Sequence, residues 1–443
     1  MQSQEQRTEK YVFLETFGCQ MNENDSDRLL GFLKDINYIR TEKVEQADFI
    51  IINTCSIRDK AEQKVYSALG RFKSLKKENP GLVIGVAGCV AQQKGEAFLK
   101  RVPYLDVVIG THNIHRIQEI LGEVSVNKRR LAVTGFSGGI DVREYGALPS
   151  QGAVKASVSI MRGCDNFCAY CVVPYTRGRE VSRAGADIIN EVSALAQKGV
   201  KEITLIGQNV NSYGAGTGLG FTALLRKVCR VDGINRVRFM TSHPKDFSGD
   251  LTRLFAEEEK LCSHAHLPAQ SGSDDVLKRM NRGYTRAQYL AKIAMLRALR
   301  PDIAVTSDII VGFPGETERD FEDTMAMINT VRYDNIFSFM YSPRPDTAAA
   351  GFDGQVPLEV KSQRLKTLQA AQQGITNDKS RALIGKTVEV LVEGGGRADG
   401  NESSGYSSCA RMVKFPAEEA VPGRLMNVLI TDAHANTLRG ALC

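Results

Sequence analysis

The sequence lacks the features of a membrane-embedded or exported protein. Its 443 residues contain no uninterrupted apolar run long enough to span a bilayer. The first ten residues, MQSQEQRTEK, are polar and charged, so we expect no signal peptide. Without an export signal, the 10 cysteines are better interpreted as metal ligands and buried thiols than as disulfides. We therefore expect a cytoplasmic protein with no membrane partner.

A strong excess of charge is also missing. The formal net charge is +6, with 42% hydrophobic and 24% charged residues, values typical of soluble globular proteins. This mild positive charge permits a nucleic-acid partner but does not require one. Because 443 residues exceed one ordinary hydrophobic core, we expect two or three domains.

A third absence concerns the segment MRGCDNFCAYCVVPYTR (161–177), which lacks a fourth cysteine. Cys164, Cys168 and Cys171 have a CxxxCxxC spacing, and thiolates this close in sequence can hold one iron–sulfur cluster. An ordinary 4Fe–4S site uses four cysteines, so one iron here would stay open to a small molecule. Structural zinc is disfavoured because no second CxxC or His pair follows. Tyr170 would place an aromatic ring beside the cluster.

Strands alternate with helices in the amino-terminal third. Strands are predicted at 11–19, 47–55, 82–90 and 106–113, and helices at 22–35 and 56–80. This alternation predicts a parallel α/β sheet. Cys19, Cys55 and Cys89 each end one of the first three strands, and the carboxyl ends of parallel strands share one edge. A single such cysteine is usually a buried hydrophobe, but three in successive repeats favour a second metal site.

The central region repeats the alternation after a predicted linker at 136–152. Six strands, interrupted mostly by helical patterns, predict a partial or full barrel with its site at the carboxyl ends of the strands. The predicted strands are 154–161, 202–209, 236–242, 265–271, 305–313 and 337–342. Polar residues stand at several strand ends, among them Gln208, Asn209, Ser242, His243, Gln270, Ser271 and Asp308. His264 and His266 are interpreted as strand or core residues because no third metal ligand accompanies them, and Cys229 as helix packing.

The carboxyl-terminal segment predicts a polar helix at 357–385 and a small antiparallel barrel. Its short strands are predicted at 386–394, 409–416, 424–433 and 436–442. Its place and pattern resemble the TRAM domain, an RNA-binding module, although the segment lacks the Gly-Arg-Thr-x-x-Asn string associated with that domain. Several basic residues would contact phosphates, namely Lys386, Arg411, Lys414, Arg424 and Arg439. Tyr406 would stack on a base, and Cys409 and Cys443 are not expected to be ligands.

The extended string MRGCDNFCAYCVVPYTRGREVSR (161–183) resembles the MiaB-type tRNA methylthiotransferases, a radical S-adenosylmethionine (SAM) family. The phrases ETFGCQMN (15–22), NTCSIRDKA (53–61) and GCVAQ (88–92) are similar to the amino-terminal domain of the same family. The resemblance implies a multidomain α/β protein in three parts. These are a methylthiotransferase domain at 8–140, a radical SAM (βα)6-type partial barrel at 150–378, and a TRAM-like β-barrel at 380–443.

The resemblance also implies the cofactors, which are two 4Fe–4S clusters and SAM. Cys164, Cys168 and Cys171 would hold the radical SAM cluster, and Cys19, Cys55 and Cys89 an auxiliary cluster that carries sulfur. The implied SAM-binding residues are Tyr170, Gln208, Ser242, Gln270, Ser271 and Asp308. The basic residues that follow the cluster loop, Arg177, Arg179 and Arg183, are further candidates for RNA contact.

The implied reaction attaches a methylthio group to carbon 2 of N6-isopentenyladenosine beside a tRNA anticodon. The implied partners are the anticodon loop, an electron donor such as flavodoxin or ferredoxin, and sulfur- or cluster-delivery proteins; we expect a monomer. Two related activities use the same six cysteines, namely methylthiolation of a ribosomal-protein aspartate or of threonylcarbamoyladenosine in tRNA. An iron–sulfur electron carrier and a zinc-containing RNA-binding protein are alternatives of other classes.

Overall fold

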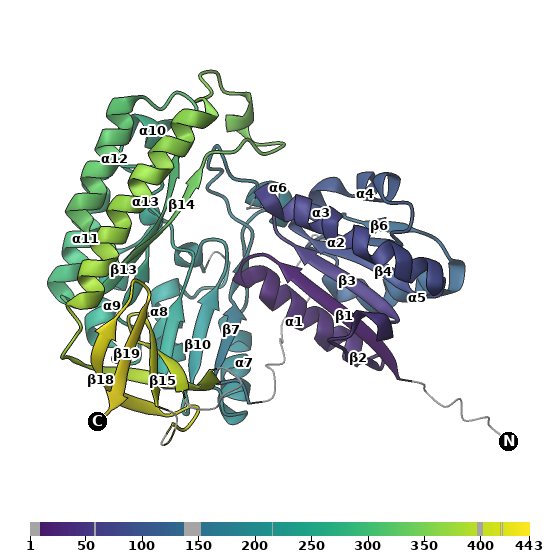
Figure 1. Ribbon diagram of the computed structural model, residues 1–443, viewed down its shortest axis with the longest axis horizontal. Coiled ribbons are helices and arrows are strands. Elements are labelled where there is room, and N and C mark those ends of the chain that lie inside the picture. Colours follow the sequence, from purple (N-terminus) through teal and green to yellow (C-terminus); the bar gives the residue numbers. More distant parts are fainter. Residues whose placement is uncertain are drawn as a thin grey trace. The chain divides into compact units, whose positions relative to one another are not determined.

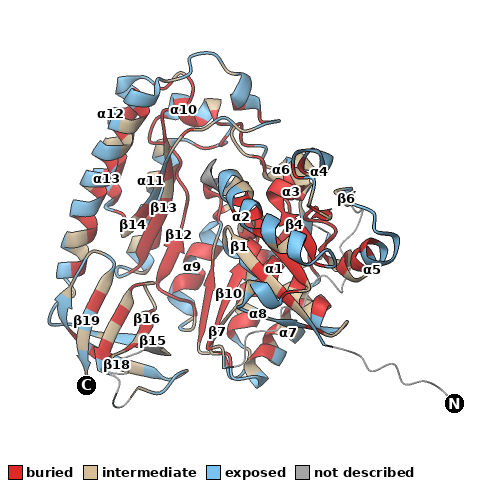
Figure 2. Cartoon of the chain, turned by 45° about the vertical axis from the view of Figure 1, so that its right-hand side comes forward, coloured by how far each residue is buried: buried red, intermediate tan, exposed pale blue. Residues whose placement is uncertain are grey.

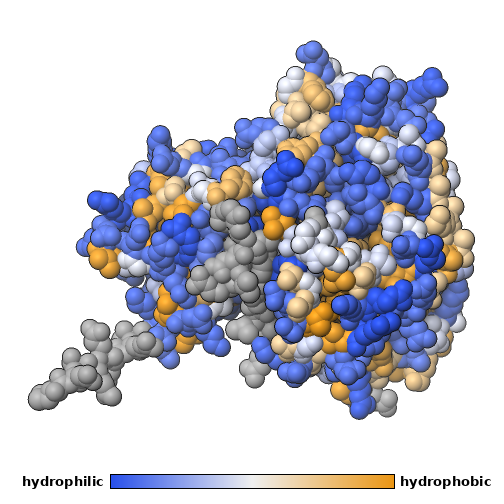
Figure 3. All heavy atoms as spheres, turned by 180° about the vertical axis from the view of Figure 1, so that it is seen from behind, coloured by the Kyte–Doolittle hydropathy of each residue, from blue (hydrophilic) through white to orange (hydrophobic). Residues whose placement is uncertain are grey.

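The computed structural model describes residues 9–56, 59–136, 152–214, 216–396, 402–416, 418 and 420–443. The chain divides into two compact units (Figure 1). Unit 1 comprises residues 1–149 with 162–165 and 172–181, and unit 2 comprises the remainder. The predicted linker lies, apart from its two end residues, outside the described residues. No helix in the described part of the chain is long and apolar enough to cross a membrane, and hydrophilic side chains cover much of the face in Figure 3.

Unit 1 contains a six-stranded parallel sheet with the order β2-β1-β3-β4-β5-β6. All four strands predicted in this region are present, and the structure adds β2 and β6 at the two edges. The strands are β1 (Lys10–Phe17), β2 (Tyr38–Arg40), β3 (Phe49–Thr54), β4 (Val83–Gly88), β5 (Val107–Ile109) and β6 (Leu131–Val133). The central strands β3 and β4 are buried at every position because helices cover both faces (Figure 2).

Alternate residues of β3 separate these two faces. Phe49 and Ile51 pack with α1 (Gln20–Lys34) and α5 (Ile117–Asn127). Ile50 and Ile52 pack with α2 (Asp59–Glu78), α3 (Cys89–Lys94) and α4 (Glu96–Arg101). The result is a three-layer α/β/α arrangement, in which the residues after each strand collect at one sheet edge.

Unit 2 contains six parallel strands in two three-stranded sheets, β7-β10-β11 and β12-β13-β14. Between the two sheets, the backbone of Val237 in β11 pairs with Leu261, just before β12. The strands are β7 (Lys155–Ser159), β10 (Glu202–Ile206), β11 (Arg236–Phe239), β12 (His264–His266), β13 (Ala304–Val311) and β14 (Asn335–Met340). The six strands predicted from the sequence are therefore confirmed, as a partial barrel rather than a closed one.

Helices cover the outer face of this partial barrel. One continuous core joins Leu205, Val237 and Val305 of the strands to the helices. The helices are α7 (Gly185–Gln197), α8 (Phe221–Cys229), α9 (Gly249–Glu257), α11 (Arg286–Leu299), α12 (Glu318–Val331) and α13 (Leu358–Arg381). Cys229 is buried in α8, as expected for a packing residue. Val305, Ile309 and Val311 of β13 pack with these helices, so the alternate, even-numbered residues lie on the opposite face of the strand, toward the barrel interior.

The carboxyl-terminal part of unit 2 is a closed five-stranded barrel with the order β15-β16-β17-β19-β18. Its strands are β15 (Thr387–Gly396), β16 (Glu402–Ser407), β17 (Met412–Pro416), β18 (Leu425–Ala433) and β19 (Thr437–Leu442). Two details differ from the prediction. β16 was not predicted, and β17 pairs with β19 in parallel, so the barrel is not wholly antiparallel. β16 was not predicted because it consists mainly of small residues, which give no strand pattern. The structure requires a small residue at Gly405, where a Cβ would overlap the carbonyl oxygen of Leu391 on β15.

Two buried arginines of β11 join this small barrel to the partial barrel. Arg236 donates hydrogen bonds to the carbonyl oxygens of Tyr406 (2.6 Å) and Glu389 (3.0 Å). Arg238 donates to the carbonyl oxygen of Ser408 (3.1 Å) and to the Glu202 carboxylate (3.3 Å). These bonds satisfy backbone carbonyl groups at the junction of two elements that are about 150 residues or more apart in sequence.

Candidate active site

Cys19, Cys55 and Cys89 lie at the carboxyl ends of three neighbouring strands. Cys19 is the residue before α1 and follows β1, Cys55 directly follows β3, and Cys89 begins α3 immediately after β4. Because β1, β3 and β4 are adjacent and parallel, the predicted meeting of the three cysteines at one sheet edge is confirmed. The backbone before Cys89 requires glycine: Gly88 has φ +94°, and a Cβ there would overlap the carbonyl oxygen of Thr54.

The three thiols contact one another. Cys55 forms side-chain hydrogen bonds with both Cys19 and Cys89. These bonds, together with the positive charge of Arg177, lower the pKa of Cys19 to about 6 and that of Cys89 to about 6. They raise the pKa of Cys55, which acts as the shared donor. The lowered pKa values favour the thiolate form of Cys19 and Cys89, which is the form that binds a metal.

Arg177 lies beside these thiols, although it follows the other cysteine motif in sequence. It occupies the last position of α6 (Val173–Arg177), and its guanidinium donates to Oδ2 of Asp25 at 2.6 Å. Its side chain also hydrogen bonds with Cys89. The ring Nε2 of His112 lies 3.0 Å from the Arg177 carbonyl oxygen, which fixes the end of α6. The thiol group thus has a buried cation that balances part of its negative charge.

Cys19, Cys55 and Cys89 fit the ligands of an iron–sulfur group, although here their thiols hydrogen bond with one another. Among the described residues, no group of three or more His, Cys, Asp or Glu side chains is spaced to hold a metal ion. Iron in such clusters is bound by thiolates. The three cysteines nevertheless meet this requirement: the pKa is lowered for Cys19 and Cys89, a guanidinium balances negative charge, and Cys55 and Cys89 are buried.

The CxxxCxxC segment forms a tight loop. The Cys164 N–H donates to the Gly178 carbonyl oxygen (3.3 Å), and the Cys171 N–H donates to the Cys168 carbonyl oxygen (2.9 Å). Gly163 has φ +78°, and a Cβ there would overlap the carbonyl oxygen of Arg179. Glycine is therefore required directly before the first cysteine of this motif.

Within unit 2, Arg282 contacts this loop through Cys168. The guanidinium Nη1 lies 3.3 Å from the Cys168 sulfur and 3.4 Å from the Tyr170 hydroxyl. Its Nη2 donates to the Pro268 carbonyl oxygen (2.9 Å), and its Nε donates to the Tyr284 hydroxyl (3.2 Å). Arg282 is only 4% exposed. Burial raises the pKa of Tyr170 and of Tyr284, so both phenols are neutral at neutral pH.

The strand-end residues predicted to bind SAM have different environments. The Ser242 hydroxyl is buried and has no hydrogen-bond partner in the described part of the chain, which fits a ligand-binding group. Ser271 lies against Thr324 (3.3 Å between hydroxyl oxygens) and accepts the Ser273 N–H, so its hydroxyl stabilises the fold. Gln270 has φ +69° and its N–H donates to the Asp308 carbonyl oxygen (2.8 Å). Gln208 follows β10 by two residues.

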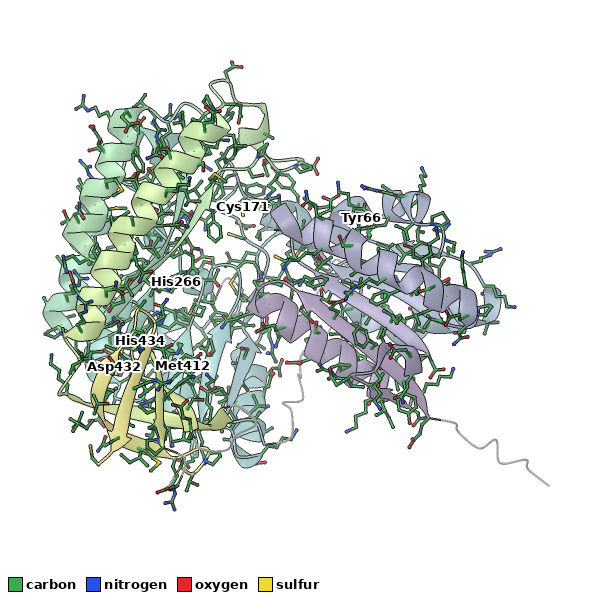
Figure 4. The ribbon with its side chains drawn as sticks, viewed as in Figure 1. Tyr66, Cys171, His266, Met412, Asp432 and His434 are labelled. Carbon is green, nitrogen blue, oxygen red and sulfur yellow. The ribbon has the colours of Figure 1, made fainter. Side chains whose placement is uncertain are left out.

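His264 and His266 are buried strand residues, as predicted. His264 Nε2 and His266 Nδ1 lie 2.9 Å and 3.0 Å from the same hydroxyl, that of Thr306 on β13. His266 Nε2 faces Asp308 at 3.7 Å, and its ring meets Phe337 of β14 edge-on. Figure 4 labels His266 in unit 2, and also Cys171. The interior face of the partial barrel therefore carries polar and aromatic groups together.

Three of the eight basic residues predicted to contact RNA are not accessible. Arg177 pairs with Asp25, Arg183 pairs with Glu191 (2.6 Å), and Arg411 pairs with Asp334 (3.0 Å). Each of the three arginines is less than 9% exposed, so the expectation of phosphate contact is corrected for them. Their carboxylate partners, two of them more than 70 residues away in sequence, balance the buried charges. The accessible members of the set are Arg179, Lys386, Lys414, Arg424 and Arg439.

Curated relatives match nearly the whole length of the chain. A tRNA-2-methylthio-N(6)-dimethylallyladenosine synthase from Geobacter sulfurreducens is 50% identical over 435 residues, which are 98% of this chain and 97% of the relative. A protein of the same name from Myxococcus xanthus is 50% identical over 440 residues, 97% of this chain and 94% of the relative. The chain belongs to the family of the tRNA-2-methylthio-N(6)-dimethylallyladenosine synthases.

Three family descriptions match successive parts of this family member. They are the uncharacterized protein family UPF0004 at residues 11–110, the radical SAM superfamily at 158–328, and the TRAM domain at 381–443. The TRAM match confirms the assignment of the carboxyl-terminal barrel, even though the expected Gly-Arg-Thr-x-x-Asn string is missing.

Solved structures share the fold at low identity. The radical S-adenosylmethionine methyltransferase TsrM from Kitasatospora setae, with cobalamin and a 4Fe–4S cluster bound, has a TM-score of 0.59 at 14% identity. The match covers 77% of both chains. The cobalamin-dependent radical enzyme OxsB has a TM-score of 0.55 at 13% identity and covers 83% of this chain and 56% of OxsB.

Sequence reasoning missed two residues that the structure places beside cysteines. Asp25 stands in a polar helix start, NENDSDR, where an acidic residue ordinarily faces solvent. Arg282 stands in a turn between α10 (Asp274–Arg279) and α11, more than a hundred residues after Cys168. Neither has a spacing signal that relates it to the cysteine motifs.

Proposed function

We propose that this protein converts N6-dimethylallyladenosine beside the tRNA anticodon into its 2-methylthio derivative. The observation that carries the proposal is 50% identity over nearly the full length to relatives that bear the name of this activity. The gathering of Cys19, Cys55 and Cys89 at one sheet edge supports it. A simple radical SAM enzyme or electron carrier needs no such second thiol group.

Two cysteine sets would hold the cofactors. Cys164, Cys168 and Cys171 would hold a 4Fe–4S cluster with one iron open to SAM. Cys19, Cys55 and Cys89 would hold a second cluster. When bound, the first cluster supplies the electron that cleaves SAM to a 5′-deoxyadenosyl radical, and the second supplies the sulfur. The chain itself positions these groups and excludes water from them.

The side chains of the partial barrel orient SAM and the base. Ser242 would use its buried hydroxyl, which has no hydrogen-bond partner among the described residues, and the backbone at Gln270, with its positive φ, would lie beside the ligand. Tyr170 is held by Arg282. Asp308 presents a carboxylate to the barrel interior beside His266. Gln208 and Ser271 complete the predicted set, with Ser271 acting through the turn that it stabilises.

The RNA contacts are proposed on accessible basic side chains. Arg179 is 73% exposed, Lys386 is exposed at the start of the small barrel, and Lys414 on β17 is partly exposed. Each would contribute a phosphate contact that weakens with salt. We place the domain boundaries at 8–140, 150–378 and 380–443, and the three family matches lie within them.

The test is a single-turnover assay on defined tRNA. Reconstituted protein, SAM and dithionite are incubated without oxygen with tRNA that carries N6-dimethylallyladenosine, and the nucleosides are identified by mass spectrometry. The 2-methylthio product is expected. Matched tRNAs carrying unmodified adenosine or threonylcarbamoyladenosine at the same position should yield no methylthio product. Product from threonylcarbamoyladenosine alone would overturn the proposed substrate.

A further inference from the structure

Arg282 is a buried cation with no carboxylate partner in the part of the chain that the structure describes. It is 4% exposed, and none of the ion pairs among the described residues includes it. Its hydrogen bonds go to one backbone carbonyl oxygen, two phenol hydroxyls and one sulfur. Burying a cation is unfavourable unless a negative group lies close to it. The described groups around Arg282 therefore leave its positive charge unbalanced.

Cys168 is the group that can supply this charge. The hydroxyls of Tyr170 and Tyr284 meet the guanidinium as phenols, which carry no charge at neutral pH. The remaining contact is the Cys168 sulfur at 3.3 Å from Nη1, and a cysteine that ligates iron does so as a thiolate. The neighbouring His243 adds no negative charge. The arginine is thus placed to compensate a thiolate and the iron–sulfur group attached to it.

A contrast with Arg177 shows what is special about this site. Arg177 also lies beside cysteines, but it pairs with Asp25 at 2.6 Å, so much of its charge is already balanced. Arg282 has no such partner among the described residues, so its charge acts on Cys168. Cys168, in unit 2, and the group of Cys19, Cys55 and Cys89, in unit 1, therefore have different electrostatic surroundings.

We propose that Arg282 is a positioning residue for the iron–sulfur group held by Cys164, Cys168 and Cys171. It donates an N–H···S hydrogen bond to a ligand sulfur and makes one-electron reduction of that group easier. The proposal rests on the proposed function, because it assumes that these cysteines bind a cluster. Reduction by one electron, supplied by dithionite in the assay, adds one negative charge beside Cys168. A guanidinium at 3.3 Å stabilises the reduced form more than the oxidised form.

The experiment uses the full chain with Cys19, Cys55 and Cys89 changed to alanine, so that only one group is observed. After reconstitution, iron is counted and the cluster is titrated with dithionite at defined potentials, with electron paramagnetic resonance as the readout. In Arg282→Gln, the ratio of reduced to oxidised cluster at a fixed potential should fall about tenfold, equivalent to about 59 mV for one electron. Arg282→Lys should restore most of the ratio because it keeps the charge.

Two further variants separate charge from general disturbance. Tyr284→Phe removes a hydrogen-bond acceptor from Nε but keeps the guanidinium, so the ratio should stay close to that of the background protein. Arg286→Gln is the matched control: Arg286 lies four residues away and pairs with Asp323 (2.6 Å) rather than with a thiol. It should leave the ratio unchanged.

The outcomes are distinguishable. A ratio in Arg282→Gln equal to that of the background protein would overturn the role of Arg282 while leaving the proposed function intact. Loss of iron from Arg282→Gln with retention in Arg282→Lys would support the role, whereas equal loss from both would overturn it. Absence of iron from the background protein would overturn the cluster assignment itself, and with it the proposed function.

Discussion

Arg177 and Asp25 form an ion pair at 2.6 Å in the interior of unit 1, beside the thiols of Cys19 and Cys89. The side chains of the pair are only 4% and 2% exposed. They are separated by 152 residues in sequence, so the pair ties the loop after the second cysteine motif to the sheet edge that carries the first. The same guanidinium stabilises the thiolates and the local fold.

Removal of the carboxylate from this pair should destabilise unit 1. We expect Asp25→Asn to lower the free energy of unfolding by about 3 kcal/mol, because a buried guanidinium loses its partner. Urea denaturation of the metal-free protein measures the change. The matched control is Asp165→Asn, which breaks the exposed pair with Arg179 and should change stability by less than about 1 kcal/mol. Equal effects of the two substitutions would contradict a special role for the buried pair.

Gly88→Ala should disrupt the amino-terminal cysteine group selectively. The new Cβ would overlap the Thr54 carbonyl oxygen, and φ +94° is strained for alanine, so Cys89 must shift. After reconstitution, we expect about eight irons per chain to fall to about four. Gly122→Ala in α5 has open space around its Cβ and should keep the full iron content. Full iron content in Gly88→Ala would show that Cys89 does not need its present position.

The two cysteine sets should have separable roles. Cys168→Ala should abolish formation of 5′-deoxyadenosine from SAM, because the radical cluster loses a ligand. Cys55→Ala should abolish the methylthio product while SAM cleavage continues, because only the sulfur source is lost. Chromatography of the two products measures both reactions in one sample. Full methylthio product from Cys55→Ala would remove the auxiliary set from the reaction.

The two arginines of β11 should hold the small barrel in place. Arg236→Ala removes hydrogen bonds from a charged donor to the Tyr406 and Glu389 carbonyl oxygens. We therefore expect the free energy of unfolding to fall by about 2 kcal/mol. Limited proteolysis followed by mass spectrometry should then release the 380–443 segment faster than in the parent protein. Arg253→Ala, an exposed position on α9, is the control. Unchanged release in Arg236→Ala would mean that the junction depends on other contacts.

His243 should make the protein sensitive to acid. Burial, with the nearby charges of Arg282 and Lys245, lowers its pKa from 6.5 to about 2. The unfolded chain therefore binds a proton below about pH 6.5 that the folded chain does not bind until about pH 2. Between these values, His243 should lower the free energy of unfolding by about 1.4 kcal/mol per pH unit as the pH decreases, and His243→Gln should remove that contribution to the slope. Unfolding midpoints measured from pH 7 to pH 4 test this, and equal slopes in the two proteins would contradict it.

Some features could be predicted because they depend on local patterns. Strands that end in Cys19, Cys55 and Cys89 were visible from apolar runs, and parallel topology then brings their ends to one edge. The six barrel strands were visible for the same reason. The short strands β2, β6 and β16 were not, because three-residue edge strands and a run of small polar residues have no pattern apart from their pairing partners.

The sequence by itself thus determined the cysteine motifs, the alternation of strands and helices, and the family. Only the tertiary structure decided which charged residues are buried. Arg177, Arg183 and Arg411 looked like surface cations, yet carboxylates from distant or opposing elements hold them inside. Arg282 drew no notice, yet it contacts the Cys168 sulfur. The physical reason is that the free energy of a charge depends on its solvation and its neighbours in space, and linear spacing specifies neither.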